Sequence, residues 1–391
     1  MLGKNSGPAF SLFARVAAAG CQGVFLVLLA RSASLAEFGI YSTICAAGAI
    51  VIGLVGLGLP IRALQLRADQ ADLGGSYLGA AAILSATSCL VCLVISTAIA
   101  GHISWIGFAA SCFTAAELQN NIAQSYLYGM KRNRDADVFT MFRRLLPLGA
   151  LVVGCSYSDS GLIFPLVSFS FVAAWLWGVF RFAGRYHFSN IRKDVFRGGS
   201  DYWLINVWAM LQQLDVILIN TFFGSYLSGL YASAVRLASP VHIVTSVVTS
   251  RLVPNLTHAP DPTARSIAWR QVYVPLRALL ALALICSPVL FWLAPLIFGL
   301  PSSALNLMYV AAFGAAILSL YSQVMSSALY TQGMASVVQR YTKIAVLFGL
   351  SLVAVGGFFE NYAVAGAGIL CSQLVLSLLL LKAKNEFEHA K

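Results

Sequence analysis

Long apolar segments separated by short polar ones run along the whole chain. Each apolar segment holds about 20 residues, which is long enough for a helix to cross a hydrocarbon core about 30 Å thick. The first segment shows no small-residue cleavage site, so we read it as a retained helix rather than a signal peptide. The pattern predicts an all-α integral membrane protein with twelve transmembrane helices, at 10–30, 39–60, 76–98, 103–127, 138–156, 161–181, 202–223, 229–250, 272–298, 304–330, 341–359 and 362–381.

The composition supports a membrane protein. Hydrophobic residues make up 59% of the 391 positions and charged residues only 10%. Mean hydropathy is +0.81, whereas a typical soluble domain has about 25% charged residues. A soluble protein of this composition would aggregate.

The basic residues indicate the orientation. Of the 25 Lys and Arg residues, all but Arg31 and Arg236 fall at the two termini, in every second connection between the predicted spans, or in the span ends that adjoin these connections. Cytoplasmic loops carry such an excess, so both termini are expected in the cytoplasm. The net charge of +11 is explained by these loops, which would also attract anionic lipid. A second interpretation is that the basic clusters at 131–144 and 181–197 gather a pyrophosphate-bearing substrate.

Several function classes are disfavoured by what the sequence lacks. The eight cysteines lie within predicted spans, where cysteine acts as a small hydrophobe. The sequence has no phosphate-binding loop, nucleophile elbow or zinc-spaced histidine pair, so we expect no enzyme activity, cofactor or metal. The outer connections are only a few residues long, which disfavours a membrane glycosyltransferase or polymerase. No nucleic-acid stacking motif accompanies the basic residues. Transport remains, with a non-transporting scaffold as a weaker alternative.

An internal repeat divides the chain. Phe38–Tyr41 (FGIY) resembles Ser228–Tyr231 (SGLY), 190 positions later, and each opens the second helix of a predicted six-helix half. We therefore predict two six-helix lobes, 1–190 and 191–391. Because six is even, the lobes have the same orientation, and transporters of this kind hold substrate between such halves near mid-depth.

Polar residues inside the predicted spans recur at three- and four-residue spacing, which places them on one helix face. Polar residues in membrane helices often only join neighbouring helices, but buried ionisable residues usually face a wet cavity. We infer a hydrated central cleft between the lobes. The candidate substrate-binding residues are Arg15, Gln22, Glu117, Asn121, Gln124, Gln212, Asp215, Arg236 and Gln323.

Asp215 and Arg236 flank a glycine-containing turn at similar distances. At 1.5 Å per residue both would lie roughly 15 Å from the turn, close to mid-membrane. An isolated charge there costs at least ~2.5 kcal/mol, so the two are expected to pair. The pair either pins the helical hairpin or opens to bind a substrate anion and a coupling cation.

Three segments resemble the polysaccharide repeat-unit flippases of the multidrug/oligosaccharidyl-lipid/polysaccharide exporter superfamily: 28–42 (LLARSASLAEFGIYS), 56–60 (GLGLP) and 214–240 (LDVILINTFFGSYLSGLYASAVRLASP), with 252–256 (LVPNL) following. The resemblance extends over nearly the whole chain. Besides Asp215 and Arg236, it assigns to the family motifs Arg31, Gly39, Tyr41, Gly224, Gly229 and Tyr231.

This resemblance implies two pseudo-symmetric lobes around a MATE-like, V-shaped cleft. It also implies alternating-access flipping of undecaprenyl-pyrophosphate-linked oligosaccharide across the bacterial plasma (inner) membrane for surface polysaccharide synthesis. The implied partners are the lipid-linked oligosaccharide and the bilayer. The resemblance also allows contacts with a polysaccharide polymerase and a chain-length regulator. The main alternative is an ion-coupled multidrug/cation antiporter on the same scaffold. Such an antiporter is expected to have more acidic residues in its cleft than the candidates above provide.

Overall fold

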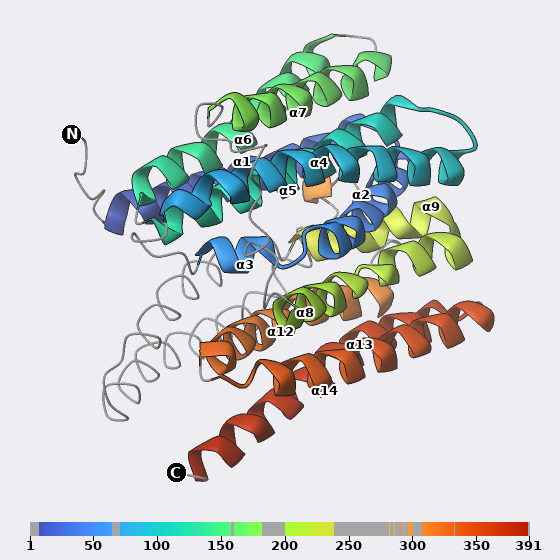
Figure 1. Cartoon of the computed structure of the whole chain (residues 1–391). Coiled ribbons are helices and arrows are strands. Elements are labelled where there is room, and N and C mark those ends of the chain that lie inside the picture. Colours follow the sequence, from blue (N-terminus) through green and yellow to red (C-terminus); the bar gives the residue numbers. More distant parts are fainter. Residues whose placement is uncertain are drawn as a thin grey trace. The chain divides into compact units, whose positions relative to one another are not determined.

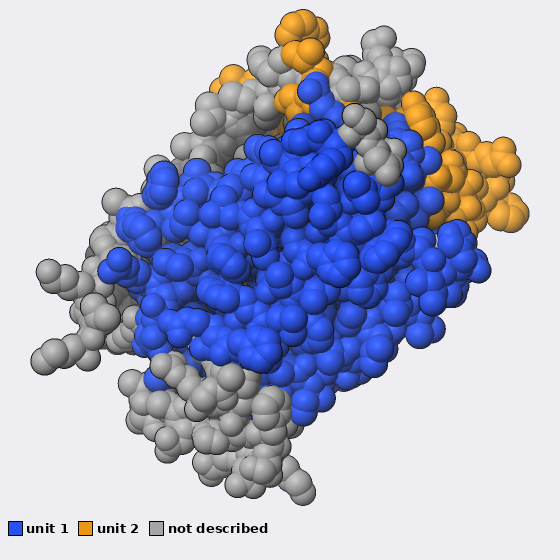
Figure 2. All heavy atoms as spheres, turned by 90° about the horizontal axis from the view of Figure 1, so that it is seen from above, with its two compact units in different colours: residues 1–217 blue, residues 218–391 orange. Residues whose placement is uncertain are grey.

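The computed structural model describes residues 8–64, 71–130, 132–157, 160–181, 200–237, 307–331 and 333–389, with 281, 285, 292 and 296–298. Throughout these residues the regular structure is helical, as predicted, and none is in a strand. The chain forms two compact units, residues 1–217 and 218–391 (Figure 2). The predicted lobe boundary near residue 190 falls outside the described residues, so the lobes 1–190 and 191–391 stay a prediction.

The first unit is built around α5. Its helices are α1 (Pro8–Ser32), α2 (Leu35–Val55), α3 (Leu59–Leu64), α4 (Ala71–Ala100), α5 (Trp105–Gly129), α6 (Asn133–Ser156), α7 (Ile163–Phe180) and α8 (Ser200–Leu211), with the 3₁₀ turn η2 (Ser160–Leu162) before α7. Helix α5 packs against α2, α3, α4, α6 and α7, and α1 packs against α6 (Figure 1). The Trp203 indole of α8 donates to the Leu54 carbonyl of α2 at 2.9 Å. Every helix in the described part of this unit thus contacts α5 or a direct neighbour of α5.

The second unit contains most of α9 (Leu214–Leu237), then α12 (Leu307–Thr331), α13 (Ala335–Phe358) and α14 (Tyr362–His389). Helix α14 packs against both α12 and α13 (Figure 1). Small residues allow the close approach of α13 and α14: a Cβ added at Gly349 would lie 2.4 Å from Ser372 Cβ, and one at Gly356 would lie 2.4 Å from Ala365 N. Small residues at helix contacts are typical of packing inside membranes, where no hydrophobic force drives association.

Eight helices among the described residues are long and apolar enough to cross a membrane, so the chain is a multi-pass membrane protein. Helix α5 is not among them because its polar residues lower its hydropathy. Most of the predicted span 272–298 lies outside the described residues. The total of twelve spans therefore stays a prediction.

One predicted span is broken in the structure. The range 39–60 was expected as a single helix, but α2 ends at Val55 and a bend leads into the short α3. Leu57 and Gly58 have φ values of 49° and 70° in this bend. Left-handed backbone cannot continue a right-handed helix, so the chain changes direction there.

The internal repeat coincides with two helix starts. Helix α2 begins after Ser34, whose side chain accepts from the Glu37 backbone while Glu37 binds the Ser34 backbone at 2.8 Å, a capping box. In the second half, Gly224 interrupts α9 with φ 83° and ψ 169°, so a new helix begins after it. Ser34 and Gly224 are separated by the repeat's own 190 positions. The two motifs therefore occupy the same position relative to the helix start that precedes each.

Replacing Gly224 with alanine should destabilise the protein by about 1–3 kcal/mol, because this backbone region is essentially restricted to glycine. A Cβ added there would meet nothing within 4 Å, so crowding makes no contribution. The matched control is Gly149→Ala in α6, where a Cβ also has open space but the backbone is helical. Unfolding by denaturing detergent should show a loss for Gly224→Ala alone. Equal midpoints for the two variants would contradict this account.

Candidate functional site: a polar seam between two helices

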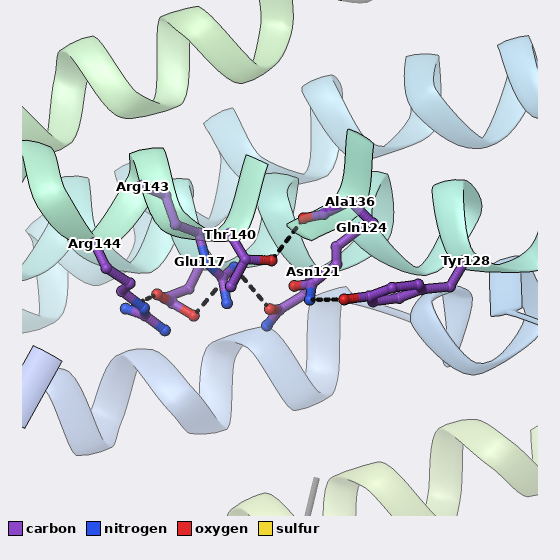
Figure 3. A network of polar contacts seen from close by, with 8 residues as sticks. All are labelled: Glu117, Asn121, Gln124, Tyr128, Ala136, Thr140, Arg143 and Arg144. Atoms are coloured by element: carbon purple, nitrogen blue, oxygen red, sulfur yellow. Dashed lines mark hydrogen bonds and ion pairs between the residues drawn. The ribbon is translucent and has the colours of Figure 1, made fainter. Parts of the chain in front are cut away.

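A row of polar side chains lies between α5 and α6 (Figure 3). From α5 come Glu117, Asn121, Gln124 and Tyr128, spaced at three or four residues and therefore on one face. From α6 come Asp137, Arg143 and Arg144, which contact them. Thr140 of α6 lies beside them and donates to the Ala136 carbonyl of its own helix (Figure 3). We call this row the α5/α6 seam.

An ion cluster occupies one end of the seam. Arg144 Nη1 lies 2.5 Å from Glu117 Oε1. Arg143 Nη1 lies 3.7 Å from Glu117 Oε2 and donates to Asn121 Oδ1 at 3.1 Å. Glu117 is therefore shared by two guanidinium groups, and the shorter contact is with Arg144.

The charges in this cluster do not balance. Among the described side chains at this end of the seam, two arginines face one carboxylate, which leaves an excess of one positive charge there, since Asp137 lies at the other end, bound to Tyr128. The side chains of Arg143, Arg144 and Glu117 are only 9%, 14% and 15% exposed. Arg143 Nε is buried without a hydrogen-bond acceptor. Charge-assisted bonds to a second anion would satisfy both the surplus charge and this unused donor.

The other end of the seam is held by a buried carboxylate. Asp137 Oδ1 accepts from the Tyr128 hydroxyl at 2.7 Å, and Gln124 Nε2 reaches the same hydroxyl at 3.5 Å. Asp137 has no exposed surface. The short Tyr128–Asp137 bond thus fixes α5 against α6 near the start of α6.

Arg143 and Arg144 lie in the interior of α6, which begins at Asn133. Counting charges assigns them to a cytoplasmic loop, although the predicted span 138–156 already contains both. The span prediction began at residue 138 because the polar first turn of α6 resembles a loop. The sequence does indicate that the helix starts earlier and contains both arginines, because no glycine or proline lies between Asn133 and the following apolar run.

The polar residues of α5 lie on two different faces in the structure. Glu117, Asn121 and Gln124 all lie in the seam, so three of the candidate residues are brought together. The neighbouring Asn120 instead lies against Gly178 of α7, where an added Cβ would approach Asn120 Oδ1 to 2.7 Å. Adjacent residues differ by about 100° around a helix, so Asn120 and Asn121 contact different neighbours.

The remaining candidates are not gathered into this seam. Arg15 and Gln22 lie on α1, where Gln22 is partly buried and the Arg15 side chain is outside the described part. Gln212 lies in the turn between α8 and α9, which breaks the predicted span 202–223. Gln323 is exposed on α12, whereas its neighbour Ser322 is buried and donates to Gln373 Oε1 of α14 at 3.1 Å. The Ser322–Gln373 contact had not been predicted.

Asp215 and Arg236 lie in the first and last turns of α9. Asp215 is buried and accepts from the Val216 backbone at 2.6 Å, and Arg236 is partly buried. Asp215 belongs to the first unit and Arg236 to the second. Their pairing stays a prediction.

The family-motif residues have mostly structural environments. Gly39, Gly229, Tyr41 and Tyr231 are buried, and the Tyr41 ring lies 6.2 Å from that of Phe164. The side chain of Arg31 is exposed in the last turn of α1. Among the described residues, no group of three His, Cys, Asp or Glu side chains is arranged to hold a metal ion.

Solved structures share this fold over nearly the full length. An outward-facing multidrug resistance MATE family transporter of the MOP superfamily is similar with a TM-score of 0.63 and 14% identity, covering 98% of this chain and 96% of that one. The eukaryotic MATE transporter AtDTX14 is similar with a TM-score of 0.68 and 14% identity, covering 96% and 94%.

A third similar structure is a MOP superfamily transporter from Pyrococcus furiosus whose binding pocket is described as having reverse polarity (TM-score 0.59, 13% identity, 96% and 95% covered). No protein-family profile and no curated protein matches the sequence. The chain therefore has the all-helical fold of MATE transporters.

Proposed function

We propose that this protein is a secondary transporter that works as an ion-coupled antiporter of amphipathic organic solutes. The observation that carries the proposal is the near-complete match to MATE transporters, which extends over 96–98% of this chain in the structures described above. These neighbours support the antiporter better than the oligosaccharide flippase suggested by the sequence motifs. We further propose a bacterial inner-membrane location, which the resemblance to the flippases implies, with both termini cytoplasmic, which the distribution of basic residues indicates.

A second candidate is the flipping of undecaprenyl-pyrophosphate-linked oligosaccharide. The observation favouring it is the excess positive charge of the ion cluster formed by Glu117, Arg143 and Arg144 at one end of the seam. A cation carrier gains nothing from a surplus guanidinium, whereas a pyrophosphate would be attracted to it. Under this alternative the bilayer, a polysaccharide polymerase and a chain-length regulator would be the partners. Neither candidate involves an enzymatic step or a cofactor.

The decisive experiment compares the two cargoes in proteoliposomes that contain the purified full-length protein. One arm imposes a proton or sodium gradient and follows ethidium fluorescence. The other incorporates a lipid-linked oligosaccharide in the bilayer and measures how much of its sugar becomes accessible to an added glycosidase. We expect gradient-dependent ethidium movement that protein-free liposomes lack. Gradient-independent exposure of the oligosaccharide with no ethidium movement would replace the antiporter with the flippase, and activity in neither arm would reject both.

A further inference from the structure

We infer that Arg143 and Arg144 form an oxyanion-binding site in which Glu117 is an internal counter-ion that the ligand's phosphate or carboxylate replaces. The inference rests on the proposed transport function and adds to its organic solutes a class of substrate that carries such a group. It assigns a binding role to two residues that the charge pattern alone interprets as markers of the cytoplasmic side.

The chemistry of the contacts matches that of an oxyanion. Glu117 presents two carboxylate oxygens, one to each arginine, at 2.5 Å from Arg144 Nη1 and 3.7 Å from Arg143 Nη1. A phosphate presents oxygens at comparable spacing, and guanidinium groups bind carboxylate and phosphate through the same planar donor fork. The position of the Glu117 carboxylate therefore shows where a ligand anion would sit.

The arginines are not saturated by the carboxylate that they share. The Arg143–Glu117 separation exceeds hydrogen-bond length, and Arg143 turns the same Nη1 towards the neutral amide oxygen of Asn121. Its Nε is buried with no acceptor. An unmet donor on a buried charge is costly, and an incoming anion would satisfy it.

Part of the site is exposed. Arg144 and Glu117 retain 14% and 15% of their side-chain exposure, and they are the pair in closest contact. A ligand would therefore meet Arg144 first and separate it from Glu117. Asn121 would then remain as a neutral partner for Arg143.

A simple brace between α5 and α6 is the competing explanation. A brace needs one arginine, and buried ion pairs add little net stability compared with apolar packing. The Tyr128–Asp137 bond already joins the same two helices. The second arginine and the residual exposure are features that a brace does not require.

The test measures binding of inorganic pyrophosphate to the full-length protein in detergent micelles, by intrinsic tryptophan fluorescence. Glu117→Gln removes the internal competitor and should bind about tenfold more tightly, while Arg144→Gln should bind at least about tenfold more weakly, since a charge-assisted bond of this kind is worth about 1.5–3 kcal/mol. Arg144→Lys, which keeps the charge but not the fork, should lie between wild type and Arg144→Gln. Arg132→Gln is the matched control, because Arg132 pairs with Asp135 at the exposed start of α6; its binding should not change.

A further arm distinguishes the source of the anion. If farnesyl diphosphate binds more tightly than pyrophosphate and depends on Arg144 in the same way, the bound anion belongs to a lipid headgroup. If the two ligands bind with equal affinity, the ligand is a free oxyanion. The site is overturned if Glu117→Gln binds pyrophosphate no better than wild type, or if tetraphenylphosphonium binding follows Arg144 in the same way. Binding that follows these expectations without any transport in proteoliposomes would reject the proposed function and leave the site standing.

Discussion

Replacing Gly356 with valine is expected to cost about 3 kcal/mol of stability, at the upper end of the range for overpacked sites. The added Cβ would lie 2.4 Å from Ala365 N, 2.9 Å from Ala365 Cα and 2.9 Å from Asn361 O. All three are backbone atoms, so no side-chain rotation can relieve the contact. The Gly356 carbonyl also accepts from Asn361 N at 2.7 Å in the α13–α14 connection. Separating the helices would therefore break this turn as well.

The midpoint of unfolding in mixed micelles with a denaturing detergent measures this loss. Gly23→Val in α1 is the control, because an added Cβ at that position meets nothing within 4 Å. A stability difference between the two variants below about 1 kcal/mol, the lower limit for overpacking, would show that α13 and α14 are not packed as described.

Replacing Glu117 with leucine is expected to cost about 3–5 kcal/mol, the usual penalty for leaving a buried charge without its partner. Here two guanidinium groups lose their shared carboxylate, and Arg143 keeps only the neutral Asn121 oxygen that the structure gives it at 3.1 Å. The same detergent titration measures the effect. Added pyrophosphate should restore part of the loss, because it supplies the missing negative charge.

A double-mutant comparison separates the ion pair from packing. Glu117→Leu with Arg144→Leu removes the closest pair together and leaves one guanidinium, so the double variant should be more stable than Glu117→Leu alone. Replacing both members of a buried pair with apolar residues is often neutral. Strictly additive losses would mean that the 2.5 Å Glu117–Arg144 contact contributes no coupling energy.

Hydrophobic patterning predicted the positions of the described helices well because a membrane span needs a minimum apolar length. The short FGIY and SGLY segments also identified two helix starts. A helix begins after Ser34, which forms a cap, and another begins after Gly224, which has a positive φ. The pattern placed the turn beside Gly224 correctly but missed the break at Gln212, where no glycine or proline marks the end of α8.

The candidate site was only partly predictable. Helical spacing grouped Glu117, Asn121 and Gln124 correctly, because it depends on one helix alone. It gave no means of identifying α6 as their partner helix, since that choice depends on packing between helices. Counting charges misassigned Arg143 and Arg144, because a basic residue pairs with an acid inside the bundle as readily as it marks a loop.

The mid-helix position of Arg143 and Arg144 has a consequence for how the protein enters the membrane during synthesis. Both lie about 15 Å from the start of α6, which is close to its centre. Two arginines at that depth would each oppose insertion by about 2.5–3.5 kcal/mol. Helix α5, which carries Glu117, is made first and offers α6 the neutralising carboxylate. The two segments are therefore expected to leave the translocation machinery together as a paired hairpin, with the charge partners already matched.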